Sequence, residues 1–146
     1  MAKAIYFDMD GTIANLYAVD GWLGMLRAYD PTPYANAEPM VRMTTLARLL
    51  NHLQSKGYTI GVVSWLSKEP TPTYDEAVAL AKREWLARHL PSVKWDEIHI
   101  VSYGVCKATV VRYEDGILFD DEERNRNEWK GTAYGVDNIL DILKSL

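Results

Sequence analysis

The chain has 146 residues, which is enough for one domain with one sizeable hydrophobic core. Apolar residues make up 48% and charged residues 25%, and these are ordinary values for a soluble globular protein. The formal net charge of -4 argues against a surface built mainly to hold a nucleic-acid backbone, because such a surface needs a basic face.

The cysteine content and the N-terminus bear on location. Cys106 is the only cysteine, so an internal disulfide is excluded and a reduced, packed thiol is expected. The N-terminus carries no apolar stretch with a cleavage site, and no apolar run approaches ~18 residues. We therefore expect a cytoplasmic protein without a membrane partner, and the sequence leaves the oligomeric state open.

The first quarter of the chain predicts a strand and an irregular segment. Residues 4–7 form a short apolar strand, which ends at Asp8. Residues 13–39 contain three prolines and two glycines and have no single period, so loop dominates. One or two amphipathic turns are expected there, with Asp20 as their cap. We expect this segment to form a small flap or cap.

The middle of the chain alternates helix and strand. A leucine stripe predicts a helix over 40–56, which Gly57 stops. A strand of β-forming residues is predicted at 58–63, and a rigid, proline-containing loop at 67–74. A second helix is predicted from about 75 to 90. Its inner face is marked by four apolar side chains: Val78, Ala81, Trp85 and Leu86.

The last third of the chain continues this alternation. Strands are predicted at 98–101, 116–119 and 133–136, and helices at about 122–129 and 139–146. Strands that alternate with helices indicate βαβ units, a mostly parallel sheet and helices on both of its faces. The sequence therefore predicts an α/β fold in a single domain over 1–146.

Polar side chains follow three of the predicted strands. Asp8 and Asp10 follow the first strand, Ser64 follows the second, and Asp120 and Asp121 follow the fourth. Parallel strands end at one edge of the sheet, where α/β proteins bind ligands, so these side chains should meet. Carboxylates about 4 Å apart in a partly desolvated cleft repel by several kcal/mol. A hard divalent cation such as Mg²⁺ is therefore expected among them.

The spacing of the first acidic pair, Asp8 and Asp10, suggests that the two carboxylates have different catalytic roles. Residues two apart in an extended strand point to the same side, so Asp8 and Asp10 can serve one substrate. One carboxylate can attack phosphorus while the other passes a proton to the leaving oxygen. Gly11 lets the chain turn away, and Thr12 can hydrogen-bond in the turn. The alternative is that the pair only caps a turn, and the second acidic pair, Asp120-Asp121, disfavours it.

These residues resemble the motifs of the haloacid dehalogenase (HAD) superfamily. Asp8-Met9-Asp10-Gly11-Thr12 matches the first motif of that superfamily. Ser64 resembles the second motif, Lys107 the third, and Asp120-Asp121 the fourth. The resemblance covers most of the chain. It implies a Rossmann-like three-layer sandwich with a minimal cap at about 13–39.

The resemblance implies a two-step transfer through an aspartyl-phosphate. Asp8 would be the nucleophile. Asp10 would act as the acid for the leaving group and then as the base for the hydrolytic water. Ser64 would hydrogen-bond a phosphate oxygen, and Lys107 would neutralise Asp8 and the transferring group.

The same resemblance implies ligands for magnesium and for the substrate. Magnesium would be held by the Asp8 carboxylate, the main-chain carbonyl of Asp10 and either Asp121 or Asp120, with Asp121 favoured. The residues expected to contact the substrate are Thr12, Ser64 and Trp65. Because Trp65 directly follows Ser64, its ring could stack on a base, and a packing role is the alternative.

Two subgroups of the superfamily look similar in further stretches. The run from Lys82 to Leu86 resembles the 5'(3')-deoxyribonucleotidases, and Val62-Val63-Ser64 with the polar loop after it resembles the phosphatase domain of polynucleotide kinase–phosphatases. A short cap leaves the site open, and the net charge of -4 favours a small substrate over a polynucleotide. We therefore expect nucleoside monophosphates as substrates, with a 3'-phosphorylated nucleic-acid end as the alternative.

A non-enzymatic function is a further alternative. Receiver-type signalling domains also place an Asp, a Ser or Thr and a Lys on an α/β sheet, bind magnesium and act as phospho-switches. In this chain Asp10 lies two residues after Asp8 and supplies an acid/base group, which a long-lived switch would lack. The sequence therefore favours an enzyme.

Overall fold

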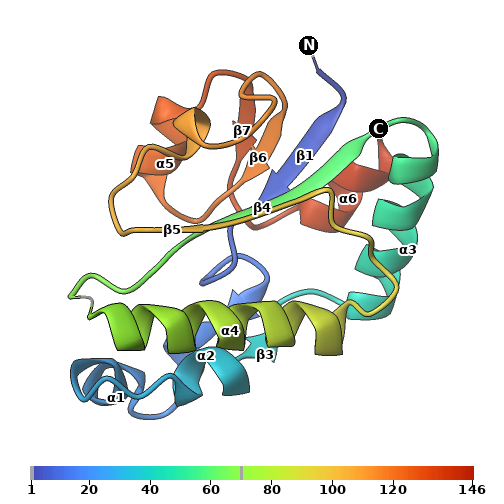
Figure 1. The fold of residues 1–146 in the computed structure, drawn as a ribbon. Coiled ribbons are helices and arrows are strands. Elements are labelled where there is room, and N and C mark those ends of the chain that lie inside the picture. The colour runs from blue at the N-terminus through green and yellow to red at the C-terminus, as the bar shows by residue number, and fades with distance from the viewer. Residues whose placement is uncertain (1, 70) are drawn as a thin grey trace.

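The computed structural model describes residues 2–69 and 71–146. A parallel sheet of five strands forms the centre of the molecule, in the order β5-β4-β1-β6-β7 (Figure 1). Its strands are β1 (Ala4–Phe7), β4 (Thr59–Trp65), β5 (Glu97–Val101), β6 (Ile117–Phe119) and β7 (Thr132–Tyr134). All neighbouring pairs are parallel, so the carboxyl ends of the strands lie at one edge. The predicted α/β fold with a mostly parallel sheet is confirmed.

The central strand of the sheet is β1. All four of its side chains are fully buried, as expected for a short apolar strand that is covered on both faces. Its last residue, Phe7, pairs with Val62 of β4 and with Phe119 of β6. This register brings the residues that follow β1 between those that follow β4 and those that follow β6.

One face of the sheet is covered by three helices, of which two are the longest that the structure describes. These are α3 (Met43–Ser55), α4 (Pro72–His89) and α6 (Ile139–Lys144). Each contributes apolar side chains to one core cluster with Phe7 of β1, and examples are Leu50, Trp85 and Leu143. The main hydrophobic core therefore lies between these helices and the sheet.

The other face is covered by shorter segments. They are the 3-10 helix η2 (Lys107–Thr109) and the helix α5 (Glu123–Glu128). Ala108 and Trp129 pack there against Tyr6 and Leu118 of the sheet, and the free thiol of Cys106 is half-buried beside them. Figure 1 shows α5 and α3 on opposite sides of the strands, which gives three layers.

Residues 14–39 form what we call the cap segment. Its elements are β2 (Ala14–Asn15), η1 (Leu16–Ala18), α1 (Trp22–Arg27), α2 (Thr32–Asn36) and β3 (Glu38–Pro39). β2 and β3 pair in antiparallel fashion and hold the two ends of the segment together. The segment is more regular than the loop expected from its prolines. The prediction that Asp20 is the N-cap residue of this helix is wrong, because the N-cap position of α1 is held by Gly21, which has no side chain to form a capping hydrogen bond.

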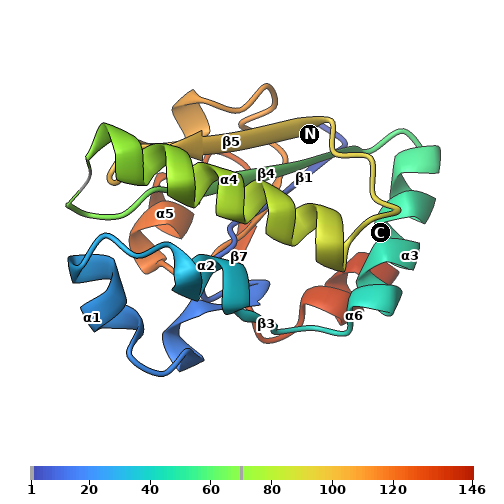
Figure 2. The ribbon, with the colours of Figure 1, turned by 60° about the horizontal axis from the view of Figure 1, so that its bottom comes forward.

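The two helices of the cap segment differ in how they are held. α2 lies along α4 (Figure 2). Trp85 Nε1 donates a hydrogen bond to the carbonyl oxygen of Ala37 at 2.7 Å, and the Tyr74 hydroxyl donates to that of Asp30 at 3.1 Å. By contrast, no residue of α1 is buried. The cap segment is therefore anchored on one side only.

Most element bounds fall within two residues of those predicted, and two differ more. α3 begins at Met43 instead of 40, and α4 begins at Pro72 instead of 75. Thr71 caps α4 by accepting a hydrogen bond from the backbone of Tyr74, and proline suits the first helical position. The predicted loop at 67–74 is therefore wrong for its last three residues, and Pro70 lies outside the described residues. Among the residues that the structure describes, no helix has the length and apolar character to span a membrane.

Candidate active site

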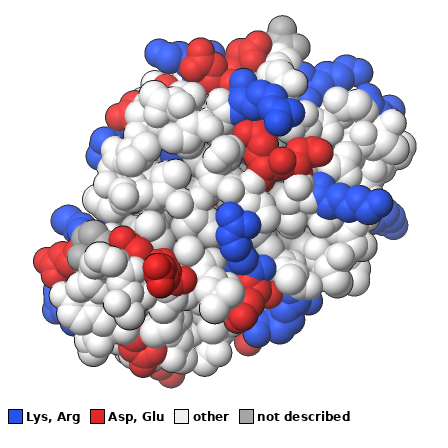
Figure 3. All heavy atoms as spheres, viewed as in Figure 1, with Lys and Arg blue, Asp and Glu red and all other residues white. Residues whose placement is uncertain are grey.

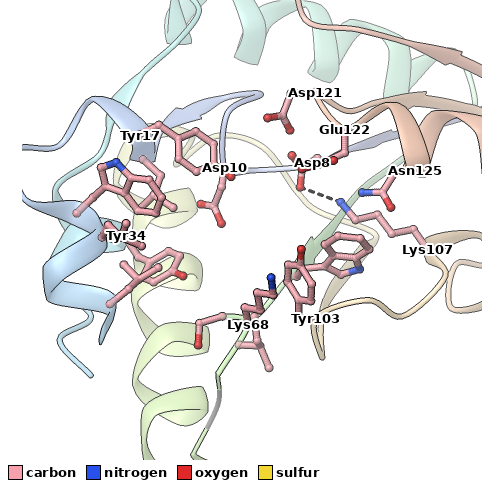
Figure 4. Close-up of a pocket in the computed structure, with 17 residues that line it drawn as sticks. Asp8, Asp10, Tyr17, Tyr34, Lys68, Tyr103, Lys107, Asp121, Glu122 and Asn125 are labelled. Atoms are coloured by element: carbon pink, nitrogen blue, oxygen red, sulfur yellow. Dashed lines mark hydrogen bonds and ion pairs between the residues drawn. The ribbon is translucent and has the colours of Figure 1, made fainter. Parts of the chain in front are cut away.

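The acidic residues that follow β1 and β6 meet at the carboxyl edge of the sheet (Figure 4). The backbone N–H of Asp8 donates to the carbonyl oxygen of Phe119 at 2.9 Å, so the ladder continues past β1. Carboxylate oxygens of Asp8, Asp120 and Asp121 lie within 4.8 Å of one another. The structure thus brings the two acidic pairs of the sequence into one site.

The turn after Asp8 fixes the direction of that carboxylate. The Thr12 hydroxyl donates to Asp8 Oδ2 at 2.9 Å and accepts from the backbone N–H of Asp121 at 3.2 Å. Thr12 is only 1% exposed, so it lies beneath the site instead of on the cavity wall. The sequence predicts a contact between Thr12 and substrate, and the structure gives Thr12 the task of orienting Asp8.

Gly11 is required at this turn for two reasons. Its φ of 78° lies in the left-handed region, where a residue with a Cβ costs about 1–2 kcal/mol. A Cβ at Gly11 would also collide with the Asp121 carboxylate and lie 2.9 Å from the Tyr17 ring.

Gly11→Ala is therefore expected to lower the unfolding midpoint modestly and to lower strongly the phosphatase activity that the HAD resemblance predicts, because the displaced Asp121 belongs to the acidic cluster. Thermal unfolding and phosphate release measured on the same preparation check this. The matched control is Gly57→Ala, since Gly57 has a φ of 97° and no heavy atom lies within 4 Å of the position that its Cβ would take. The expectation fails if both variants lose activity equally.

Lys107 links the two acidic pairs. Its Nζ donates to Asp8 Oδ1 at 2.8 Å and to Asp120 Oδ2 at 2.7 Å, and the side chain is 2% exposed. Burial alone lowers the pKa of Lys107, but the charges of Asp8 and Asp120 outweigh it and raise that pKa above its usual range. The ammonium therefore stays charged beside the carboxylate that the HAD resemblance predicts to be the nucleophile.

The adjacent Asp120 and Asp121 have different surroundings. Both oxygens of Asp120 are engaged, because Oδ2 also accepts from Asn125 Nδ2 at 3.1 Å and Oδ1 accepts from the backbone N–H of Glu122 at 2.9 Å. Asp121 lines the open cavity instead. Burial and the nearby Asp8 charge raise the pKa of Asp120 to about 6 and that of Asp121 to about 8.

These residues fit a magnesium ion. Lys107 brings one positive charge to three carboxylates that lie within 4.8 Å of one another, and oxygen ligands are those that Mg²⁺ prefers. The buried Oδ1 of Asn125 has no hydrogen-bond partner among the described residues and can accept from a water of a hydrated cation. Of the three clustered carboxylates, those of Asp8 and Asp121 line the cavity and could hold the ion.

A second buried lysine, which the sequence did not single out, holds Asp10. Lys82 of α4 is 1% exposed, and its Nζ donates to Asp10 Oδ2 at 2.9 Å and to Ser64 Oγ at 2.7 Å. Burial raises the pKa of Asp10, and the Lys82 charge opposes that rise. A signal was present in the sequence, because Lys82 lies in the apolar stripe between Val78 and Trp85 where a buried side chain is expected.

A cavity of about 260 Å³ opens over the acidic cluster. Its floor includes Asp8 and Asp10, and Lys68 points into it (Figure 4). The cap segment supplies a largely apolar wall: Leu16, Tyr17, Trp22, Leu23, Leu26 and Tyr34. Ser67 also lines the cavity, and its buried Oγ has no hydrogen-bond partner among the described residues. Ser64 is fully buried beneath, so its predicted contact with phosphate stays a prediction.

Trp65 lines the cavity but has neighbours on its ring. Lys107 Nζ lies 5.4 Å and the Arg124 guanidinium carbon 5.6 Å from the ring centroid, and the Tyr103 ring lies at 4.8 Å. The indole N–H donates to the carbonyl oxygen of Val105 at 2.8 Å. Tyr103, which is 47% exposed, therefore presents more free aromatic surface than Trp65 does.

Comparison with known proteins places the fold. No protein-family model matches the sequence, and no curated protein was found to be similar in sequence. The solved D,D-heptose 1,7-bisphosphate phosphatase from Burkholderia thailandensis is similar over 98% of this chain and 97% of its own, with a TM-score of 0.57 and 12% identity. That from B. bronchiseptica, in complex with magnesium and phosphate, is similar over 90% of this chain and 78% of its own, with a TM-score of 0.55 and 14% identity.

The chain has the fold of these phosphatases. This confirms the predicted Rossmann-like architecture of the HAD type. At 12% and 14% identity the likeness is one of fold, so the chemistry has to be argued from the residues of the site. The resemblance to the nucleotidases and to the kinase–phosphatases stays a prediction.

Proposed function

We propose that the chain is a magnesium-dependent phosphomonoester hydrolase that acts through Asp8 on nucleoside monophosphates. The observation that carries this proposal is the environment of Asp8. Its carboxylate is held by the Thr12 hydroxyl at 2.9 Å and by Lys107 at 2.8 Å, and it faces a cavity that Asp10 also lines. A covalent nucleophile needs such fixed partners, and a nearby cation stabilises the charge that develops in the transition state.

The reaction would proceed in two steps. An oxygen of Asp8 attacks phosphorus, the bond from phosphorus to the ester oxygen breaks, and Asp10 gives its proton to the departing oxygen. A water molecule then attacks the aspartyl-phosphate, Asp10 accepts a proton from that water, and the bond from phosphorus to Asp8 breaks. Inorganic phosphate leaves, and both carboxyl groups return to their starting states.

The charges around Asp8 would support both steps. Magnesium, held by the Asp8 carboxylate, the main-chain carbonyl of Asp10 and Asp121, would supply positive charge to the phosphoryl oxygens. Lys107 stays beside Asp8, and its positive charge reduces the electrostatic repulsion between the Asp8 carboxylate and an incoming phosphate. The Ser67 hydroxyl, which has no hydrogen-bond partner in the described part of the chain, would be free to bind the substrate, and Ser64 stays the predicted donor to a phosphate oxygen.

Asp10→Asn is expected to lower kcat/KM, which reports the first transfer step, by about 10²–10⁴-fold on alkyl phosphates, because the leaving group loses its proton donor. The loss should shrink for aryl phosphates with good leaving groups, which need little protonation. Steady-state kinetics on a series of aryl and alkyl phosphates measure this. An equal loss across the series would remove Asp10 from the acid role.

The cavity walls favour a substrate that carries an aromatic base over one that carries a second phosphate. The cap segment presents Tyr17, Trp22 and leucines to the cavity, and Tyr103 lies across from them (Figure 4). Aromatic and apolar walls of this kind can stack on a nucleobase. Of the lysines that line the cavity, Lys107 is bound to two carboxylates, which leaves Lys68 to receive further negative charge. A sugar bisphosphate would need more cations than these.

A polynucleotide end is the second candidate substrate. On the face seen in Figure 3, Lys and Arg are scattered among Asp and Glu and do not form a continuous basic tract. With a net charge of -4, this surface offers little to a long phosphate backbone.

One phosphate-release panel at fixed magnesium concentration tests the substrate. It contains 5'- and 3'-mononucleotides, a 3'-phosphorylated oligonucleotide, a sugar monophosphate, a sugar bisphosphate and an aryl phosphate. We expect the mononucleotides to have the highest kcat/KM. A tenfold or greater preference for the oligonucleotide would replace them with a nucleic-acid end. A preference for the sugar phosphates would leave only the phosphatase chemistry.

The lifetime of the phosphoenzyme separates an enzyme from a receiver-type switch. After labelling with a small phosphodonor, an enzyme of this mechanism loses the aspartyl-phosphate rapidly, because Asp10 activates water. Acid-quenched samples taken over time measure the decay. A phosphoenzyme that persists for minutes, together with no turnover, would favour the switch.

A further inference from the structure

The contacts of Lys82 reach beyond the residues already given a role. Lys82 belongs to α4, which packs on the face of the sheet, and its Nζ reaches the carboxyl edge of that sheet. There it donates to three acceptors: Asp10 Oδ2 at 2.9 Å, Ser64 Oγ at 2.7 Å and the carbonyl oxygen of Trp65 at 2.6 Å. All three hydrogens of the ammonium group are therefore used, and its position is fixed.

This ammonium group lies inside the protein. Lys82 is 1% exposed and Ser64 is fully buried, while Asp10 is 16% exposed at the cavity. The Lys82 Nζ also lies 5.1 Å from the centroid of the Tyr34 ring in the cap segment. A buried charge is costly unless it is paired and hydrogen-bonded, so its presence at this position needs a reason. A purely structural role could have been filled by an apolar side chain of the same stripe.

We propose that Lys82 is a positioning residue for the phosphatase reaction, which holds Asp10 and Ser64 in their working arrangement. The proposal rests on the function proposed above. By binding Asp10 Oδ2, Lys82 leaves the other carboxyl oxygen to exchange a proton with the leaving group and with water. By donating to Ser64 Oγ, it makes that oxygen an acceptor, so the hydroxyl hydrogen stays available to another partner. Misplacement of a catalytic group by about 1 Å can cost about 100-fold in rate.

Kinetics of Lys82→Met test the role. We expect kcat/KM, which reports the first transfer step, to fall about 100-fold on an alkyl phosphate and only about tenfold on an aryl phosphate with a good leaving group, because only the first needs a well-placed acid. In an Asp10→Asn background, Lys82→Met should lower the rate further by less than about threefold, because both changes disable the same acid function of Asp10. Arg83→Met, an exposed neighbour on α4, is the matched control and should leave both rates unchanged.

The outcomes separate a positioning role from simple damage. Equal losses on both phosphates, or losses that multiply with those of Asp10→Asn, would overturn the proposal in favour of a structural role. Lys82→Gln is the second variant, since it keeps a hydrogen-bond donor, and it should retain more activity on the alkyl phosphate than Lys82→Met does. Circular dichroism checks that both variants fold.

A further measurement keeps Lys82 in place and does not depend on activity. The ammonium hydrogens of Lys82 are shielded from solvent, so their ¹H–¹⁵N signal should be visible by NMR and should shift in Asp10→Asn. A signal that does not move would overturn the contact, even if the Lys82 variants fail to fold. If the contact is present and the wild-type enzyme hydrolyses no phosphate ester, the proposed function falls and the positioning role falls with it. If the wild type is active and the losses are uniform, the Lys82 proposal alone is overturned.

Discussion

Asp8→Asn is expected to abolish phosphate release, with kcat lower by at least about 10⁴-fold, because the amide cannot attack phosphorus. Asp8 is the carboxylate on which Thr12 and Lys107 converge, and the amide oxygen of Asn can still accept from one of them. The variant should therefore fold. Phosphate release from an aryl phosphate measures the loss, and an acid-stable phosphoenzyme should be absent.

The matched control for Asp8→Asn is Asp137→Asn, at an exposed position that does not line the cavity. It should retain full activity. An Asp8→Asn protein that keeps more than a tenth of wild-type kcat would remove Asp8 as nucleophile, and the search would move to Asp121, which lies in the same cluster.

Removal of divalent metal is expected to stop turnover, and added Mg²⁺ should restore it. The reason is that Asp8, Asp120 and Asp121 lie too close together to receive a phosphate without a cation. Asp121→Asn should raise the Mg²⁺ concentration for half-maximal activity by about tenfold or more. Magnesium titrations of phosphate release, after treatment with EDTA and dialysis, provide the measurement.

Asp120→Asn serves as the comparison, because Asp120 is fully buried and bound to Lys107. Breaking a buried pair of this kind costs about 3–5 kcal/mol. Asp120→Asn should therefore lower the stability of the protein markedly and change its magnesium requirement less than Asp121→Asn does. Activity that persists unchanged after complete metal removal would contradict the mechanism as a whole.

The sequence predicted the sheet and the meeting of Asp8 with Asp120 and Asp121, because both depend on local patterns. Apolar runs mark the strands, and parallel strands place whatever follows them at one edge. The different tasks of Asp120 and Asp121 could not be predicted. Two adjacent carboxylates look alike in a sequence, and only the packing of η2 and α5 makes one of them the partner of Lys107.

Lys82 and Trp65 show a second limit. Lys82 carries a signal of burial, but the sequence does not say which groups its ammonium meets, since α4 and Asp10 are far apart in the chain. Trp65 was weighed as a base-stacking residue from its place beside Ser64. Its ring lies between the cations of Lys107 and Arg124 and the Tyr103 ring, and these contacts come from three separate segments.

The one-sided anchoring of the cap segment limits how this site could diversify. The carbonyl oxygens of Asp30 and Ala37, which flank α2, accept hydrogen bonds from Tyr74 and Trp85 of α4, so changes that shift α2 would disturb these contacts and, through Trp85, the main core. Changes in α1 carry no such cost, since none of its residues is buried, yet Leu23 and Leu26 line the cavity. Mutational tolerance and control over selectivity thus coincide on one short helix. A library confined to Trp22–Arg27 should alter which phosphate esters are accepted while the catalytic floor stays intact.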